Sequence, residues 1–194
     1  MRIIMAAAFS VTATLIGGCA SGESYVKAGF DFEKLDRIAI ATVAGDLETE
    51  QARNQIADFF ATELEDRGYT PMSRAEVDGE LKSRRVAISE EGGIRAAIRA
   101  GLALDVPAVL AVDVRILGEE ITIAAKMIDV ETGGILWMAE EQQSPRQGPA
   151  GIFNPPAKTD NLRGSGGPGL SAEKVERARK LIRKICKTLP AKKR

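Results

Sequence analysis

A short apolar run at the N-terminus ends in a cysteine, and this pattern limits which residues can belong to the fold. The positive start Met1-Arg2 precedes an apolar stretch over residues 3–16, which Gly17-Gly18-Cys19 closes. About 14 apolar residues suit the hydrophobic region of a secretory signal, whereas a membrane-spanning helix needs about 20. We therefore expect a bacterial lipobox, with residues 1–18 removed as a signal peptide and Cys19 carrying acyl chains. The alternative is an uncleaved helix with a chance cysteine.

The residues after Cys19 predict where the anchor leads. Ala20, and not Asp, occupies the position after the cysteine, which resembles lipoproteins sent to the outer membrane of a two-membrane bacterium. Stable attachment takes two or more acyl chains, such as a diacylglyceryl group plus an N-linked acyl group. Residues 19–34 are mostly small and polar and predict a short lipidated tether. We expect a lipid-anchored protein of the outer membrane, with its domain in the periplasm or at the cell surface.

Composition restricts the chemistry that the remaining 176 residues (194 minus 18) can perform. The length suits one domain with a sizeable core. The chain has no histidine, which removes the most common general base and metal ligand. Cys186 is the only cysteine besides Cys19, so we expect no disulfide within the chain. Neither a metal nor a cofactor is expected.

The charge of the chain is balanced overall but concentrated at one end. Residues 171–194 contain ten Lys or Arg and two Glu, a net charge of +8, although the whole chain is neutral. Such a basic end could contact anionic lipid headgroups, peptidoglycan or an acidic partner, or it could simply be a solvated helix face. The candidate contact residues are Lys180, Arg183, Lys184 and Lys187.

Hydrophobic spacing over residues 35–105 alternates between strand and helix patterns. Residues 37–44 are nearly all apolar, as in a strand buried on both faces. A helix with apolar positions from Ala52 to Leu64 should follow, and residues 69–72 predict a short strand that Pro71 places at a sheet edge. Ser73-Arg74-Ala75-Glu76 matches a capping box for a helix reaching about Leu81. A third helix is expected to bury the stripe Ile94, Ala97, Ile98, Gly101 and Leu102.

The second half predicts three strands and one helix. Residues 109–117, 121–130 and 135–141 are separated by hairpin signals at 118–119 and 131–134, which favours an antiparallel meander. Residues 144–170 are rich in Pro and Gly and predict a long loop. With Ser171 as N-cap, a helix should bury Cys186 and other apolar residues up to Leu189. We predict an α/β (α+β) fold with a mixed five-stranded sheet in the order β-α-β-α-α-β-β-β-α, comprising a core at 35–143 and a completing helix at 171–194.

Four features could carry chemistry, and each has a simpler structural interpretation. Residues 164–169 are glycine-rich but lack the preceding strand and the Gly-Lys-Ser/Thr ending of a phosphate-binding loop. Asp113 and Asp129 lie on adjacent predicted strands and could form a carboxylate pair, although Asp129 is better explained as a turn residue. Trp137 could stack on a sugar but is better explained by packing, and Cys186 on an apolar helix face would be a poor nucleophile. We expect no catalytic residues and no enzyme.

The order of these elements resembles the CsgG-like lipoproteins of curli assembly and transport. It is also similar to peptidoglycan-synthase activator lipoproteins and to the TolB amino-terminal domain. The resemblance rests on the lipobox and on four segments, 37–43, 63–69, 103–110 and 128–137, of which the last is the most specific. Channel-forming members add membrane-crossing β-hairpins, for which the turns at 118–119 and 131–134 leave no room. The prolines of segment 144–170 would interrupt such strands.

The resemblance implies a non-enzymatic interaction or assembly module of the cell envelope, a CsgG-like secretion or assembly accessory without its own membrane-crossing hairpins. Its partners would be the membrane, through the lipid, and envelope proteins, with self-association into a homo-oligomer also implied and no nucleic acid. A regulator that docks on a peptidoglycan synthase is the alternative, although residues 20–33 are short for a tether that must cross toward the wall. A hydrolase that uses Asp113 and Asp129 is a third and weaker hypothesis.

Overall fold

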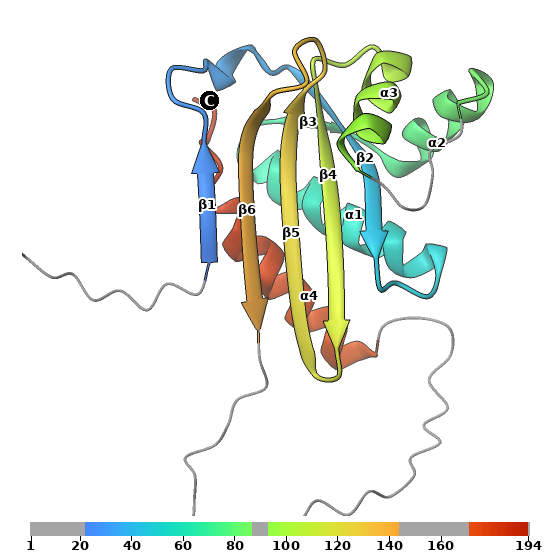
Figure 1. Ribbon diagram of the computed structural model, residues 1–194, viewed down its shortest axis with the longest axis vertical. Coiled ribbons are helices and arrows are strands. Elements are labelled where there is room, and N and C mark those ends of the chain that lie inside the picture. The colour runs from blue at the N-terminus through green and yellow to red at the C-terminus, as the bar shows by residue number, and fades with distance from the viewer. Residues whose placement is uncertain (1–21, 87–92, 144–170, 194) are drawn as a thin grey trace, which may run out of the picture.

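Six strands form one mixed sheet in the computed structural model, which describes residues 22–86, 93–143 and 171–193 (Figure 1). The strands are β1 (Gly22–Val26), β2 (Arg37–Gly45), β3 (Thr70–Met72), β4 (Ala108–Leu117), β5 (Glu120–Asp129) and β6 (Ile135–Gln143). The helices are α1 (Glu50–Asp66), α2 (Arg74–Ser83), α3 (Ile94–Leu104) and α4 (Ala172–Cys186), with a short 3-10 helix, η1 (Phe32–Lys34). The mixed α+β sheet expected from the sequence is confirmed.

The strand order β1-β6-β5-β4-β2-β3 explains why helices lie on both faces of the sheet. β2 pairs in parallel with β3 and with β4, and the remaining pairs are antiparallel. The connection through α1 moves outward to β3, whereas the connection through α2 and α3 returns across β2 to β4. Crossover connections between parallel strands are right-handed. Because the two connections run in opposite directions across the sheet, α1 lies on one face and α2 and α3 lie on the other. The described residues therefore contain two parallel crossovers, one through α1 and one through α2 and α3.

One face of the sheet is covered by α1 and α4 along its length (Figure 1). The apolar side of α4 contributes Ala178, Leu181, Ile182, Ile185 and Cys186 to the larger core, which also holds the inward residues of β4, β5 and β6. Ser171 caps this helix by accepting a hydrogen bond from the Lys174 backbone N–H. The expected Ser171 cap and the burial of Cys186 are confirmed.

Trp137 of β6 ties the sheet to the end of the chain. Its ring is fully buried, and its Nε1–H donates a hydrogen bond of 3.0 Å to Oγ1 of Thr188, just beyond α4. The Tyr69 hydroxyl donates to the backbone oxygen of Pro190 at 2.7 Å, so two aromatic side chains hold the segment after α4. Burial raises the pKa of Tyr69 well above its ordinary value, which keeps that donor protonated. The packing role expected for Trp137 is confirmed.

The sheet has six strands, so the prediction of five was wrong, and the additional strand lies within the expected tether. β1 pairs antiparallel with β6 from Gly22 opposite Glu141 to Val26 opposite Trp137. Farther along, Phe32 of η1 is buried against the larger core. β1 has no hydrophobic pattern because four of its five residues are exposed, so only backbone pairing places it in the sheet.

The third helix exists where it was expected, but its buried side differs from the prediction. Ile94 and Leu102 of the predicted stripe are 38% and 62% exposed, while the small residues Ala96 and Ala100 are buried. Gly101 lies directly against Val109 and Val130, where a Cβ would collide with their side chains. Ala97 and Gly101 of the predicted stripe are buried as expected. Small residues therefore bring α3 close to the sheet, and Leu104 at the end of the helix is also buried, whereas Ile94 and Leu102 lie at its margins.

The local predictions for β3, the start of α2 and the hairpins are also confirmed, whereas the loop expected over residues 144–170 lies outside the described residues. Pro71 lies in the edge strand β3, and the Ser73–Glu76 capping box is complete at the start of α2. The hairpins between β4, β5 and β6 form, and the turn before β6 is held by the Asp129 carboxylate, which accepts a hydrogen bond from the Thr132 N–H at 2.8 Å. In the described residues, no helix combines the length and apolar character that crossing a bilayer requires.

We predict that Thr188→Val destabilises the fold by about 1–3 kcal/mol, because it leaves the buried Trp137 N–H without an acceptor. Denaturant unfolding of the wild type and the variant measures the difference. Thr62→Val is the matched control, since the Thr62 hydroxyl also donates within a helix but lies in an exposed position. Equal stabilities for the two variants would contradict the role of the Trp137–Thr188 hydrogen bond.

A second prediction concerns the capping box. The Ser73 backbone N–H and hydroxyl both donate to the Glu76 carboxylate and lower its pKa below the ordinary 4.5. A lowered folded-state pKa stabilises the fold above the unfolded value, and this contribution is lost as the pH falls through the folded-state pKa. Glu76→Gln should therefore melt slightly below the wild type at neutral pH, and the gap should close on acidification. Thermal unfolding across pH tests this, and a gap that widens toward low pH would contradict it.

Candidate interaction surface

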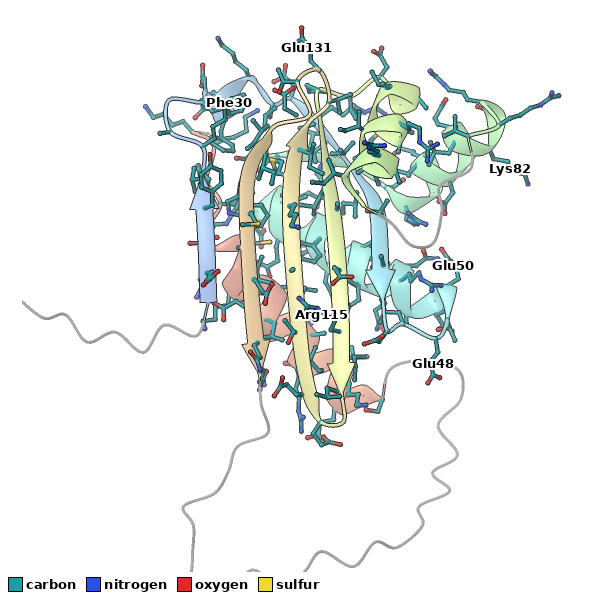
Figure 2. All side chains as sticks on the ribbon, viewed as in Figure 1. Phe30, Glu48, Glu50, Lys82, Arg115 and Glu131 are labelled. Carbon is teal, nitrogen blue, oxygen red and sulfur yellow. The ribbon has the colours of Figure 1, made fainter. Side chains whose placement is uncertain are left out.

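Among the described residues, no helix lies on part of the second sheet face. α2 and α3 cover it near β2 and at one end of β4, where a smaller core forms around Val109 and Ile128. Farther along β4, Asp113 and Arg115 alternate with buried residues and are exposed. We call the uncovered part the open sheet face. Figure 2 labels Arg115 in the middle of it, with α4 behind the sheet. Its residues are Glu23, Tyr25, Ala111, Asp113, Arg115, Ala124, Lys126, Met138 and Glu140.

The strand register arranges these side chains in two neighbouring rows across the sheet. The first row contains Ala111, Lys126, Met138 and Tyr25 in the order of the strands β4, β5, β6 and β1. The second row, in the same order, contains Asp113, Ala124, Glu140 and Glu23. Each row therefore combines small or apolar side chains with charged ones, and the charged side chains of the second row are all acidic.

Arg115 links the acids of the second row. Its guanidinium lies 3.4 Å from Asp113 and 3.5 Å from Glu140, so it joins β4 to β6 across the intervening strand. All three side chains are about half exposed, so water screens these ion pairs and they stabilise the fold little. The arrangement nevertheless presents one cation between two carboxylates at a fixed position.

A shallow cavity of about 340 Å³ lies on the open sheet face. Ala111, Ala124 and Met138 supply apolar surface in its lining, and Gly93 and Ile94 of the α3 end border it. Charged side chains also line it, including Lys126, which has no ion pair with any described residue. An apolar centre bordered by charged groups is the usual anatomy of a protein–protein contact surface.

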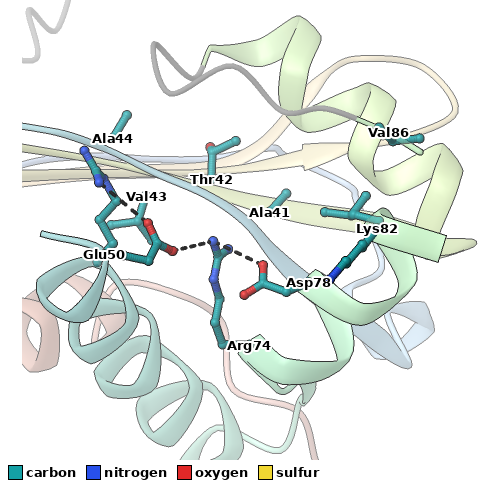
Figure 3. A pocket seen from close by; sticks show the side chains of 11 residues that line it. Ala41, Thr42, Val43, Ala44, Glu50, Arg74, Asp78, Lys82 and Val86 are labelled. Atoms are coloured by element: carbon teal, nitrogen blue, oxygen red, sulfur yellow. Dashed lines mark hydrogen bonds and ion pairs between the residues drawn. The ribbon is translucent and has the colours of Figure 1, made fainter. Parts of the chain in front are cut away.

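A second cavity of about 330 Å³ lies beside it, between α1 and α2, and shares Thr42 and Ala44 in its lining (Figure 3). Of its charged groups, Glu50, Arg53, Arg74 and Asp78 pair with one another, and Lys82 has no ion pair with a described residue. Arg74 is 3.2 Å from Glu50 and 3.3 Å from Asp78, and Glu50 also pairs with Arg53. Figure 3 shows the Arg74 side chain between the two carboxylates, which join the start of α1 to α2. These groups are best explained as a connection between helices.

The structure separates the two carboxylates considered for catalysis. Asp113 faces Ala124 on β5, and Asp129 lies five positions farther along the same strand. At about 3.4 Å per residue they are about 17 Å apart along the sheet, too far to act on one bond. The Asp129 carboxylate instead accepts a hydrogen bond from the Thr132 N–H within its own turn. No cluster of three metal-ligating side chains occurs in the part of the chain that the structure describes.

The other chemical candidate, Cys186, is 1% exposed in the larger core. Burial raises the pKa of its thiol to about 12, with a smaller contribution from the charge of Glu63. The thiol therefore stays protonated at physiological pH, as the interpretation of Cys186 as a small core residue requires.

The four basic residues proposed for contact lie on or just after α4, and three of them already have acidic partners. Lys180 lies 3.7 Å from Glu176, and Arg183 lies 3.2 Å from Glu63. The Lys184 ammonium is 2.6 Å from the Glu141 carboxylate, which is nearly buried. Lys187 is exposed and has no ion pair with a described residue. Much of the positive charge of this helix is therefore used within the domain.

Two candidate features, Cys19 and the glycine-rich residues 164–169, lie outside the described residues. The open sheet face was not identified from the sequence, because it arises from strand register. One signal was present, since Thr122, Ala124 and Lys126 alternate with the apolar residues Ile121, Ile123 and Ala125. Such alternation indicates a strand with one face left uncovered by apolar packing.

Comparison with solved structures places this arrangement of strands and helices among known folds. The chain is similar to the PelC dodecamer from Paraburkholderia phytofirmans, with a TM-score of 0.51 and 15% identity over 89% of this chain and 98% of that one. It is also similar to the LpoB C-terminal domain from Salmonella enterica, with a TM-score of 0.48 and 14% identity over 57% of this chain and 84% of that one. Lipoprotein GNA1162 from Neisseria meningitidis is similar with a TM-score of 0.46 and 16% identity over 60% of this chain and 89% of that one. At these identities the similarity to PelC establishes the fold. No family model and no curated protein matches the sequence.

Proposed function

We propose that this chain is a non-enzymatic lipoprotein of the bacterial envelope whose α/β domain binds another envelope protein through the open sheet face. The observation that carries the proposal is the uncovered row of Ala111, Lys126, Met138 and Tyr25 beside the Arg115-linked acids. Sheet faces normally bury their apolar side chains against another layer, and here helices cover only one end. A partner protein would supply the missing layer.

The mixture of charges on the open sheet face supports a protein as its occupant. Lys126 lacks an ion pair with a described residue, so it is available to a complementary charge. A lipid surface or a nucleic acid would require a predominance of positive charge, whereas this face contains three carboxylates and two cations. Complementary charges of both signs favour specificity for one partner.

The proposed anchor and the position of β1 together restrict the reach of the domain. Only Ala20 and Ser21 separate Cys19 from the first residue of β1. Three residue steps span at most about 11 Å of extended chain. With a lipid on Cys19, the domain would lie next to the bilayer, which supports a partner at the outer membrane. The same distance weighs against the alternative of a regulator that crosses to a peptidoglycan synthase.

A secretion or assembly accessory of the CsgG-like type is the specific form of this proposal. The fold shared with the PelC dodecamer supports an architecture that can assemble into an oligomer, so self-association is part of the proposal. The domain would then act as a scaffold that presents the open sheet face, without membrane-crossing hairpins of its own.

The test of the surface is site-specific photo-crosslinking in cells, with identification of the captured protein by mass spectrometry. A crosslinking residue in place of Lys126 should capture one envelope protein, whereas one in place of the exposed Asp58 on α1, on the opposite side of the sheet, should not. Adding Arg115→Glu should reduce capture several-fold, because a third carboxylate would stand between Asp113 and Glu140.

The matched control for that variant is Lys187→Glu, which makes the same change in net charge at an exposed position just after α4. Capture through Lys126 should be unchanged in this control. If Lys187→Glu abolished capture and Arg115→Glu did not, the interface would lie on the basic helix and the proposal for the open sheet face would be wrong.

The anchor is tested separately by Cys19→Ala. We expect this variant to move from the membrane fraction to the soluble fraction as a folded domain, since acyl chains on Cys19 would supply its attachment. Cys186→Ala removes the only other cysteine, which is buried, and should remain in the membrane fraction. Immunoblots of fractionated cells measure both, and a Cys19→Ala protein that stays with the membranes would refute the lipobox.

A further inference from the structure

The free edge of the sheet is formed by β1, whose only strand neighbour among the described residues is β6. The Lys27 N–H donates to the Leu136 carbonyl oxygen at 2.8 Å, so Lys27 directs its backbone groups toward β6. Backbone direction alternates along a strand, so Tyr25 and Glu23 also face β6, while Gly22, Ser24 and Val26 direct their N–H and C=O groups outward. An outward row of this kind is a template for another strand.

The side chains of this edge add two further observations. Tyr25 and Val26 are 47% and 39% exposed, unusually large fractions for side chains of this size. Glu23 lies directly opposite Glu140 on β6, a residue of the same charge. Within the described part of the chain neither Glu23 nor Lys27 has an ion pair, and the Lys27 ammonium instead lies 5.7 Å from the Phe30 ring centre. The edge therefore offers one acid and one base without oppositely charged partners.

We propose that two copies of this chain pair through β1, antiparallel, about a two-fold axis at Tyr25. In this register Ser24 of one copy lies opposite Val26 of the partner subunit, and the two residues exchange backbone hydrogen bonds. Tyr25 faces its own counterpart, and Glu23 faces Lys27 of the partner subunit. The two six-stranded sheets then continue into each other.

Charge and backbone direction favour an axis at Tyr25 over its neighbours, and they favour a second copy of this chain as the partner of β1. Glu23 and Lys27 are each two positions from Tyr25, on the same side of the strand, so an antiparallel copy brings every acid opposite a base. An axis at Ser24 would place Glu23 opposite Tyr25 and leave Lys27 without an acid. An axis at Glu23 would bring two carboxylates together. The strand is thus complementary to itself in one register, which a second copy supplies directly.

The test is disulfide crosslinking of the full-length chain in cells, and its readout is the homodimer itself, not the capture of a partner through Lys126. Residues opposite each other in a non-hydrogen-bonded antiparallel pair have Cα atoms about 4.5 Å apart, within the range that a disulfide spans. Tyr25→Cys should therefore give a disulfide-linked homodimer on a non-reducing gel, and Ser24→Cys should give several-fold less. The wild-type chain, which keeps Cys19 and the buried Cys186, sets the background.

Charge reversal supplies the decisive control. Lys27→Glu in the Tyr25→Cys background should reduce the dimer several-fold, because Glu23 would face a carboxylate, and adding Glu23→Lys should restore it. All these residues lie at the exposed edge or beside it, so the fold should be kept, as circular dichroism checks. Absence of a Tyr25→Cys dimer, a stronger dimer from Ser24→Cys, or a mixed disulfide with a different protein would each overturn the proposal.

Discussion

The packing of α4 against the sheet is the contact on which the rest of the domain depends. β5 and β6 present their buried rows toward this helix, whereas α1 packs against β2 and β3. The helix lies far along the chain from β6, so the sheet is completed only when the C-terminus returns. Arg67 and Tyr69, at the end of α1, then bind the backbone oxygens of Leu189 and Pro190. The core is therefore closed by its last segment.

The same packing decides which face of the sheet remains available. The two crossover connections send α1 to the face that α4 also covers, and α2 with α3 to the other. Because α2 and α3 are short and lie near β2, their face is covered at one end only. The open sheet face is thus a consequence of connection lengths and handedness. Its charged residues tolerate water, which explains why this face remains compatible with a folded domain.

The sequence predicted the elements whose positions are set by their own side chains. The alternation at residues 121–130, the Ser73–Glu76 capping box and the turn at Asp129 each carry a local signal, and each is confirmed. β1 was missed because its side chains are exposed and its place depends on hydrogen bonds to a strand more than a hundred residues away. The buried side of α3 was predicted only in part. Gly101 was in the predicted stripe, but Ala96 and Ala100 were missed because small residues bring the helix close to the sheet without adding much hydrophobic area. The open sheet face requires the strand register, which no local pattern contains.

The buried Trp137 has a practical consequence for studying the protein. It is the only tryptophan in the chain, and its indole lies where β6 meets the segment after α4, hydrogen-bonded to Thr188. Its fluorescence emission therefore reports on one contact alone, the seating of the C-terminal helix against the sheet. A shift of that emission to longer wavelength would mark the moment at which the core opens, in the natural sequence and without an added label.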